Sequence, residues 1–584
     1  MTFSLRTALS LLLLSFSMAS FPSETKITVA FTTDVHGNFF PYDFITLAPG
    51  EGSLARVSTA VDSLRAANPG GVILLDNGDI LQGQPTVYYY NFIDTVSPHI
   101  VPEVFDFMGY DAATIGNHDV ETGHAVYDRV HKAMDIPWLG ANVIDTLTDA
   151  PYLTPYTVIE RKGKKIAVLG LLTPAIPSWL PENLWSGLRF DDMAATARKW
   201  IPIIREREHP DAIIGLFHSG HDASKTTGSV IENASMKVAA EVDGFDLVLM
   251  GHDHQRFLSE VVSPSGKKVP VVNPANNARS IGAIDFVFHD TPSGKDSLSV
   301  IPKLLDVTAV SPSKSYLARF ADRLSSVSDF VERQLGTVTD TLSTRDAFFG
   351  PSSFMTLLHD LQLEISGAQI SFAAPLSFDA SIVAGPLRVS DMFTLYKYEN
   401  MLYTLKLTGR EIKDYLEMAY DLWTAPVSDS EDSQLIRFAS ENPSLADNRL
   451  KNPSYNFDSA AGIDYTVDIT KPRGEKITIT SLSDGTPFNP DSTYTVAVNS
   501  YRANGGGDLL TLGAGIPADE LSSRVVRATD KDLRYYLIKA VEKRGVVSPR
   551  VETNWRFVPE KLASEAGRRS RQLLFGAEAS RNQK

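Results

Sequence analysis

Five short motifs of Asp, His and Asn follow apolar runs in the first half of this 584-residue chain. The motifs are Asp34-Val35-His36, Asn77-Gly78-Asp79, Gly116-Asn117-His118-Asp119, His218-Ser219-Gly220-His221 and Gly251-His252-Asp253-His254. Carboxylate, imidazole and amide groups offer oxygen and nitrogen to divalent metals. The chain contains no cysteine, which excludes thiolate ligands, Cys nucleophiles and disulfides. Each motif alone is more typical of a turn or a surface pair, but together they predict a metal centre.

The elements before these motifs should bring them together. From Lys26 to about Val300, apolar runs alternate with amphipathic or Gly-containing stretches, which is typical of an α/β layer structure. The runs are residues 27–31, 72–75, 112–115, 165–171, 212–217 and 245–250. Ligands of open α/β sheets bind outside the carboxyl ends of the strands, so we expect the five motifs to converge there.

The second half of the chain has a different composition. Eleven of the twelve histidines lie at or before His289, and only His359 follows. Residues 402–407 and 462–470 are predicted strands, and residues 409–423 are a predicted helix, which indicates an α+β domain. Residues 316–335 are predicted to form one connecting helix that stops at Gly336. We therefore expect domains at 24–310 and 337–560, a linker helix at 311–336 and a flexible tail at 561–584.

Charge and the N-terminus narrow the class of protein. The chain has 55 basic and 70 acidic residues, which argues against a duplex nucleic-acid partner but leaves a small nucleotide open. Arg6, the apolar residues 8–16 and Ser17-Met18-Ala19 predict a signal peptide, residues 1–19, cleaved near Ala19. The apolar run is too short for a membrane anchor, and no later stretch approaches a spanning length. We expect a soluble secreted or periplasmic protein; the sequence leaves its oligomeric state open.

In this order, the five motifs resemble those of the calcineurin-like metallophosphoesterase superfamily over about residues 27–300. The resemblance implies an α/β metallophosphoesterase sandwich that binds two divalent metal ions. It assigns Asp34, His36, Asp79 and His254 to one ion, and Asp79, Asn117, His218 and His252 to the other. A bridging carboxylate at Asp79 fits a pair of dications, because it partly neutralises their repulsion. Oxygen and nitrogen ligands suit Zn, Mn, Fe, Co or Mg and do not choose among them.

His118 follows a ligand but is not needed in either set, so we expect it to be the general acid that protonates the leaving oxygen. In 5′-nucleotidase-like relatives a carboxylate follows this histidine by three residues, where this chain has Glu121. Asp119 is the competing partner for His118. For both carboxylates the alternative is a supporting role behind the metal ligands.

Residues 345–422 and 455–507 resemble the C-terminal domain of the 5′-nucleotidase family, which covers the base of a nucleotide held at the metals. From this resemblance we expect Phe457 and Tyr501 to stack on the base; ordinary core burial is the alternative for both. We also expect substrate contacts from the Gly-rich run that follows Tyr501. Its candidate residues are Asn504, Gly505, Gly506 and Asp508. The family usually places its second stacking aromatic after this run, where this chain has Leu509 and Leu510.

One departure favours a branch of the family. Typical 5′-nucleotidases carry Asn-Gly-Gly followed by Arg where this chain reads Ser371-Phe372-Ala373-Ala374-Pro375-Leu376, with no arginine before Arg388. Together with residues 76–83, 395–400 and 455–458, this resembles the 2′,3′-cyclic-nucleotide 2′-phosphodiesterase/3′-nucleotidase branch. That branch implies hydrolysis of cyclic nucleotides to 3′-nucleotides and then to nucleoside and phosphate. The alternatives are a 5′-nucleotidase or nucleoside-diphosphate-sugar hydrolase, a non-catalytic nucleotide-binding surface protein, and a structural export factor with an incidental metal.

Overall fold

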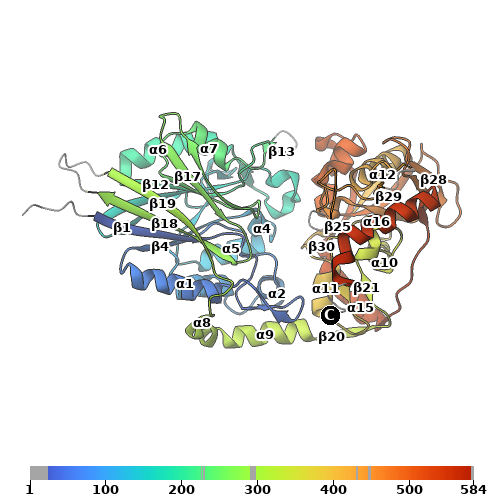
Figure 1. Cartoon of the computed structure of the whole chain (residues 1–584), viewed down its shortest axis with the longest axis horizontal. Helices are drawn as coiled ribbons and strands as arrows, with labels where there is room; N and C mark the ends of the chain where they lie inside the picture. The colour runs from blue at the N-terminus through green and yellow to red at the C-terminus, as the bar shows by residue number, and fades with distance from the viewer. Residues whose placement is uncertain are drawn as a thin grey trace, which may run out of the picture.

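The structure is a computed structural model that describes residues 24–224, 226–227, 230–289, 297–428, 432–444 and 449–579. It forms two lobes, the N-terminal one blue to green and the C-terminal one yellow to red (Figure 1). The expected signal peptide, residues 1–19, lies outside the described residues. Across the described ranges, no helix is both long and apolar enough to cross a membrane.

The first lobe is built on two six-stranded sheets. The first has the order β19 (Ser297–Asp306), β18 (Ser280–His289), β1 (Glu24–Thr32), β4 (Val72–Asp76), β5 (Ala112–Thr114) and β6 (Trp138–Leu139). The second has the order β16 (Arg256–Val262), β17 (Lys268–Pro274), β15 (Leu247–Met250), β12 (Ala212–His218), β10 (Lys164–Leu172) and β9 (Tyr156–Arg161). The six predicted strands coincide with β1, β4 and β5 in one sheet and β10, β12 and β15 in the other.

Apolar side chains hold the lobe together as four layers. Residues such as Val29 and Phe31 of β1 pack against Ile214 and Leu216 of β12 in a dry core between the sheets. Helices cover the two outer faces, as continuous apolar clusters show. They are α1 (Leu54–Ala67), α3 (Ile100–Met108) and α5 (His124–Ala133) on the first sheet, and α6 (Met193–Glu208) and α7 (Ser235–Glu241) on the second. The fold is the expected α/β sandwich.

The connecting segment differs from the single helix that we predicted. It contains α8 (Lys314–Arg319) and α9 (Ala321–Glu332), and Gly336 lies within strand β20 (Gln334–Val338) rather than at a helix end. The helix breaks at Phe320, whose backbone leaves the helical region (φ −108°, ψ 18°). The Phe320 ring packs on Tyr316 and Phe107, with ring centroids 4.8 and 5.5 Å apart. Burial of this ring is thus achieved at the cost of helix continuity. α9 runs along the base of the molecule toward the second lobe (Figure 1).

The second lobe is α+β, as expected. Its main sheet has the order β26 (Ser459–Ala461), β22 (Ile370–Ala373), β29 (Thr493–Asn499), β25 (Met401–Thr408) and β30 (Val525–Asp532). A three-stranded sheet follows the order β28 (Ile477–Leu482), β27 (Ile463–Asp468) and β32 (Trp555–Val558). The main helices are α10 (Ser353–Ser366), α11 (Val389–Leu395), α12 (Gly409–Trp423) and α15 (Leu533–Arg544). The predicted strands at 402–407 and 462–470 and the predicted helix at 409–423 correspond to β25, β27 and α12.

The expected flexible tail is wrong for the residues that the structure describes there. Residues Glu560–Ala579 form a helix, α16. Ala566 and Ser570 on one face of it are fully buried, and the Ser570 hydroxyl accepts hydrogen bonds from the backbone N–H groups of Leu435 and Ile436. Spacing of apolar and small residues by three to four positions gives this basic segment a face that the core can bury.

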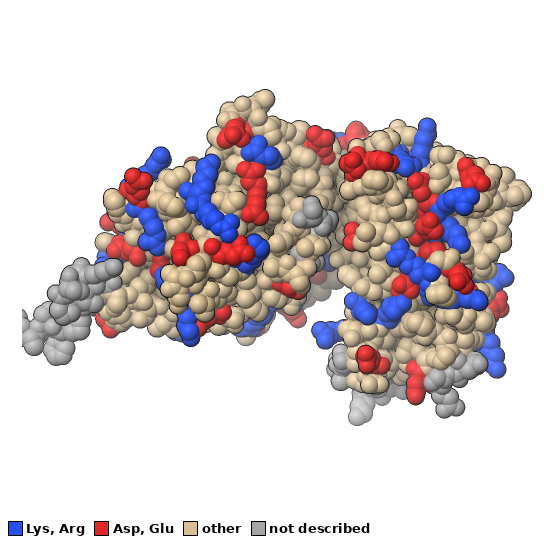
Figure 2. Space-filling view, turned by 90° about the horizontal axis from the view of Figure 1, so that it is seen from above, with Lys and Arg blue, Asp and Glu red and all other residues tan. Residues whose placement is uncertain are grey.

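The two lobes share buried contacts near the base. Tyr88 of α2 (Pro85–Tyr88) lies against Phe393 of α11, with ring centroids 5.2 Å apart, and its hydroxyl donates to Asp532 at 3.1 Å. Seen from above, a cleft separates the lobes over part of their facing surfaces, and basic and acidic residues are mixed on both (Figure 2). α4 (Asn117–Val120), which carries His118, lies on the side of the first lobe that faces the second (Figure 1).

Candidate metal centre and substrate site

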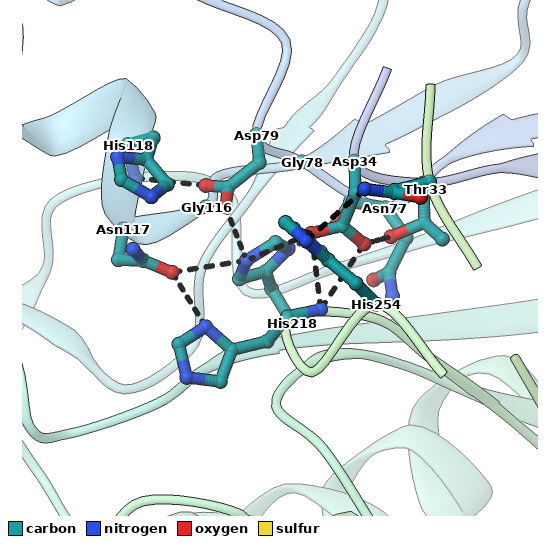
Figure 3. A network of polar contacts seen from close by, with 12 residues as sticks. Thr33, Asp34, Asn77, Gly78, Asp79, Gly116, Asn117, His118, His218 and His254 are labelled. Atoms are coloured by element: carbon teal, nitrogen blue, oxygen red, sulfur yellow. Dashed lines mark hydrogen bonds and ion pairs between the residues drawn. The ribbon is translucent and has the colours of Figure 1, made fainter. Parts of the chain in front are cut away.

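The carboxyl ends of strands from both sheets bring the predicted ligands together (Figure 3). Asp34, His36 and His254 offer ligand atoms within 4.8 Å of one another. The same is true of Asp79, His218 and His252. Asn117 joins the second group, since its side-chain oxygen lies 3.1 Å from His218 Nε2 and 2.8 Å from His252 Nδ1. The groups are adjacent, because His218 Nε2 lies 3.1 Å from Asp79 and 4.0 Å from Asp34.

The backbone at these positions is unusual. Five candidate ligands have a positive φ: Asp34, His36, Asp79, His252 and His254, with values of 48–73°. Residues other than glycine rarely adopt this left-handed backbone conformation, and those that do concentrate at functional sites. The sharp turns at the strand ends are fixed by the site itself; for example, the backbone N–H of His118 donates to Asp79 Oδ1 at 2.8 Å (Figure 3).

Hydrogen bonds orient the imidazoles toward the site. His218 Nδ1 lies 2.6 Å from the Asn77 carbonyl, and His36 Nδ1 lies 3.1 Å from the Gln82 carbonyl. A carbonyl only accepts, so each Nδ1 carries a proton and Nε2 is the ring nitrogen that faces the site. His252 does the reverse, with Nε2 against the Glu232 carboxylate at 3.1 Å and Nδ1 inward. Metal-binding histidines are typically held in this way by a carbonyl or carboxylate.

The donors fit divalent metal ions. Asp79 Oδ2 is buried and makes no hydrogen bond, and His36 Nε2 faces His254 Nε2 at 3.0 Å. Burial, together with the electrostatic effect of the neighbouring His254 ring, lowers the pKa of His36 to about 3, so its ring is neutral. Burial opposes a charge on His218, but the carboxylates of Asp79 and Asp34 outweigh it and raise the pKa to about 10. That negative field would equally favour a dication, which competes with the proton for Nε2.

His118 has one close partner. Its Nδ1 lies 2.5 Å from Glu121 Oε2, so the geometry pairs it with Glu121 rather than with Asp119. Burial opposes protonation of His118, but the charges of Asp79 and Glu121 raise its pKa to about 9. The Asp119 carboxylate instead accepts hydrogen bonds from the backbone N–H groups of Asp79, Ile80, Leu81 and Gly116. Asp119 therefore supports the loop that carries Asp79, which was the alternative role for it.

The expected stacking role of Phe457 is wrong. Phe457 is fully buried in the core of the second lobe, where its ring lies parallel to Trp423 at a centroid distance of 5.5 Å. Tyr455, two residues earlier, is only partly buried. A short helical turn at Ser454–Asn456 precedes Phe457, which enters the core, and leaves Tyr455 half-buried.

Tyr501 is partly buried at the start of α13 (Ser500–Ala503), and its ring centroid lies 6.3 Å from that of Tyr455 at an angle of 90°. Burial raises the pKa of Tyr501, and Glu232 of the first lobe adds to this shift, so the two side chains lie in the same region of the molecule. Burial also raises the pKa of Tyr398, to which Tyr455 and Glu121 both contribute. The Gly-rich residues form the adjacent loop. In that loop Asn504 donates to the Ser500 carbonyl, Gly505 has a positive φ, Gly506 is buried under the Tyr501 ring, and Asp508 accepts from Thr511.

Two residues at the site had no recognisable signal in the sequence. Glu232 contacts His252 as described, and the ring of Trp179 stacks on His252 at 5.5 Å and 27°. Neither belongs to a motif, and neither follows a strand that the hydrophobic pattern predicts. His221, the last residue of the fourth motif, pairs with Asp253 at 2.5 Å.

The comparisons with known proteins agree with this architecture. Residues 27–256 match the family model of the calcineurin-like phosphoesterases, and residues 334–513 match that of the 5′-nucleotidase C-terminal domain. The chain joins a calcineurin-like phosphoesterase domain to a 5′-nucleotidase C-terminal domain. It is therefore a hydrolase of the phosphoesterase/nucleotidase family.

Relatives match along most of the chain at low identity. The 2′,3′-cyclic-nucleotide 2′-phosphodiesterase/3′-nucleotidase of Yersinia enterocolitica is 25% identical over 94% of this chain and 90% of its own. The trifunctional nucleotide phosphoesterase protein YfkN of Bacillus subtilis is 27% identical over 92% of this chain, which spans only 39% of that protein. The crystal structure of a putative 5′-nucleotidase from Staphylococcus aureus has a TM-score of 0.74 at 20% identity, covering 91% of this chain and all of the other.

Proposed function

We propose that this protein is an exported dinuclear metallohydrolase that converts 2′,3′-cyclic nucleotides to 3′-nucleotides and then to nucleoside and phosphate. The observation that carries the proposal is the meeting of two ligand groups beside the His118–Glu121 pair, on the side of the first lobe that faces the second (Figure 1). A phosphate ester at the metals would then have a proton donor on one side and aromatic rings within the reach of its base.

The metal ligands would act in two sets. Asp34, His36, Asp79 and His254 would hold one divalent ion, and Asp79, Asn117, His218 and His252 the other. When bound, such a pair of ions stabilises charge that develops on phosphoryl oxygens and acidifies water for attack. The left-handed turns hold these donors in place before substrate arrives, which favours preorganised stabilisation of charge.

His118 would move the protons in both steps. In the first step, the oxygen of a water that releases one proton to solvent bonds to phosphorus, the bond between phosphorus and O2′ breaks, and protonated His118 gives its proton to O2′. In the second step, the oxygen of another water that releases one proton to solvent bonds to the phosphorus of the 3′-phosphate, the bond between phosphorus and O3′ breaks, and His118, protonated again from solvent, donates to O3′. Glu121, at 2.5 Å from Nδ1, favours the protonated ring and directs Nε2 toward the leaving oxygen.

The base would bind against Tyr501 and Tyr455, which replaces Phe457 in the pair that we first expected. Their rings meet edge to face with centroids 6.3 Å apart, so a base of any identity could stack on the face of one ring and contact the other. The segment that replaces the usual Asn-Gly-Gly-Arg, residues 371–376, contains no Lys or Arg and so presents no cation to a 5′-phosphate, which supports the cyclic-nucleotide branch. Its first residue, Ser371, is buried and hydrogen-bonded to His359 and Gln362.

The test is phosphate release from 2′,3′-cyclic AMP, 3′-AMP and 5′-AMP by the purified protein, with Mn²⁺ or with chelator. For the cyclic ester, coupled detection of 3′-AMP separates the first step from the second. We expect chelator-sensitive turnover of the first two substrates. Turnover of 5′-AMP alone would establish the 5′-nucleotidase alternative. Binding of nucleotide without turnover would leave the non-catalytic alternative.

A further inference from the structure

One buried arginine contacts both sides of the proposed base-binding site. Arg502, the residue after Tyr501, is 2% exposed. Its guanidinium makes a two-point ion pair with Asp458, with NH2 to Oδ1 at 2.8 Å and Nε to Oδ2 at 3.2 Å. The Tyr415 hydroxyl also donates to Asp458. The pair therefore has a fixed orientation inside the second lobe.

The remaining donors of Arg502 reach the two surface segments. NH2 donates to the Tyr455 carbonyl at 2.8 Å and NH1 to the Asn456 side-chain oxygen at 3.2 Å. NH1 also donates to the Gly506 carbonyl at 2.6 Å, within the loop that supports the Tyr501 ring. One planar group thus links the turn that carries Tyr455 to the loop beneath Tyr501. A lysine could not make this set of contacts, because its ammonium lacks the planar fork.

The glycines of the loop fit closely around this arrangement. A methyl group at position 506 would overlap the ring of Tyr501, and one at position 507 would overlap Arg502 NH1 and Asn456 Oδ1. Gly507 also has φ +71°. The Gly-rich run is therefore shaped by the Tyr501 ring and the Arg502 guanidinium, not only by the flexibility of a loop.

We propose that Arg502 is the positioning residue for base binding: it sets the separation and angle of Tyr455 and Tyr501. This inference rests on the proposed function, because it assigns the two tyrosines to the base of a nucleotide. Arg502 does not contact the metal ligands and acts on the base through its neighbours. Loss of its contacts should weaken binding of the base while leaving chemistry at the metals unchanged.

Gly507→Ala and Gly515→Ala form a matched pair for the experiment. The two glycines have nearly equal φ values, +71° and +73°, so an added methyl group strains both backbones alike. No atom lies within 4 Å of the added methyl at position 515, whereas the one at 507 displaces Arg502. Arg502→Lys removes the fork directly. Asn456→Ala removes one partner and keeps the buried ion pair, in case Arg502→Lys does not fold.

The measurements are the Kd of adenosine by calorimetry and the kcat/KM for glycerol 2-phosphate, a substrate without a base. We expect Gly507→Ala and Arg502→Lys to raise the Kd about tenfold, within the range for a weakened base-stacking contact, and Asn456→Ala to raise it less. Gly515→Ala should bind adenosine as the wild type does, and glycerol 2-phosphate turnover should stay within about twofold in every folded variant.

Equal Kd values for Gly507→Ala and Gly515→Ala would overturn the inference, as would a wild-type protein that does not bind adenosine. The proposed function fails separately, if adenosine binds but no nucleotide is hydrolysed.

Discussion

The first lobe, with the candidate metal ligands, and the second lobe, with the proposed base-binding tyrosines, differ in how closely residue type determines residue role. We call them the metal half and the base-binding half. In the first lobe, all seven candidate ligands meet in two adjacent groups. In the second, one of the two aromatic candidates, Phe457, is a core residue, and its place near Tyr501 is taken by Tyr455. The difference lies in the cost of burial. A buried carboxylate or imidazole needs a partner, while a buried phenyl ring needs only neighbours.

A polar motif at a strand end is therefore stronger evidence of a site than an aromatic motif in a loop. Asp79 Oδ2 is fully buried and faces His218 Nε2 at 3.1 Å, so its burial needs a positive partner, which a bound cation would supply. Phe457 lies parallel to Trp423 in a packed core, and that alone accounts for it. The predictions below test this contrast between the halves.

The largest effect should come from the shared carboxylate. Asp79→Asn keeps the shape of the side chain but removes the charge that the proposed centre shares between its two ions, so we expect activity to fall to background. If one carboxylate serves both ions, bound metal should also fall. Phosphate release and elemental analysis measure the two. Asp484→Asn, an exposed change in the second lobe, is the control. Full metal content and full activity in Asp79→Asn would show that this carboxylate does not bridge.

The next largest effect should come from the proton donor. His118→Ala should slow hydrolysis of 3′-AMP by about 10²–10⁴-fold, the usual contribution of general acid catalysis. It should have much less effect on bis(4-nitrophenyl) phosphate, whose leaving group departs as a stable anion. His124→Ala, at a partly exposed histidine that contacts Asp128, is the control. An equal loss on both substrates would mean that His118 acts on the metals or on the fold rather than on the leaving oxygen.

In the second lobe, substitutions of the half-buried tyrosines and of the core phenylalanine should have different effects on KM and on stability. Tyr501→Ala and Tyr455→Ala should raise KM for nucleotides about 5- to 150-fold, the range of one base-stacking contact, with little change in stability. Phe457→Ala should instead cost about 3–5 kcal/mol of unfolding free energy and leave KM unchanged. Urea unfolding and initial rates distinguish these outcomes. A Phe457→Ala protein that is stable but binds nucleotide poorly would restore the original assignment.

Sequence patterns predicted the strands, both lobes and the ligand clusters because these depend on local periodicity and on residues at strand ends. They did not predict the break at Phe320, since one of the rings against which it packs, Phe107, comes from a distant helix. Nor did they predict Glu232, which reaches His252 from a segment without periodicity. The helical tail α16 was missed because its charged residues obscure a narrow face of small side chains.

Glu232 allows a test of how far the metal half extends beyond its motifs. Glu232→Gln keeps the size of the side chain but weakens the hydrogen bond to His252, so metal affinity should fall about 10- to 100-fold. Activity should return at high Mn²⁺ concentration. Glu241→Gln removes an exposed carboxylate on α7 that pairs with Lys237 and Arg198, and should leave affinity unchanged. Unaltered metal affinity in Glu232→Gln would limit the site to the motif residues.

The smallest effect concerns stability, and it uses the single histidine of the second half. His359 is buried between the hydroxyls of Ser371 and Ser459, and burial alone lowers its pKa to about 3. The unfolded chain takes up a proton on this ring below pH about 6.5, but the folded protein does not until pH is near 3. The contribution of the neutral His359 ring to the free energy of unfolding is therefore fully present above pH 6.5 and decreases as the pH falls.

Between pH 6.5 and 5.5 this one group should cost the wild type about 1 kcal/mol of unfolding free energy that His359→Gln does not lose. Urea unfolding of both proteins at the two pH values, with chelator present, gives the difference. The histidines of the metal half are the same in both proteins, so their contribution cancels. If the free energies of unfolding of the two proteins changed equally with pH, His359 would become protonated within the folded lobe. The second lobe would then resemble the first in containing a buried charged group.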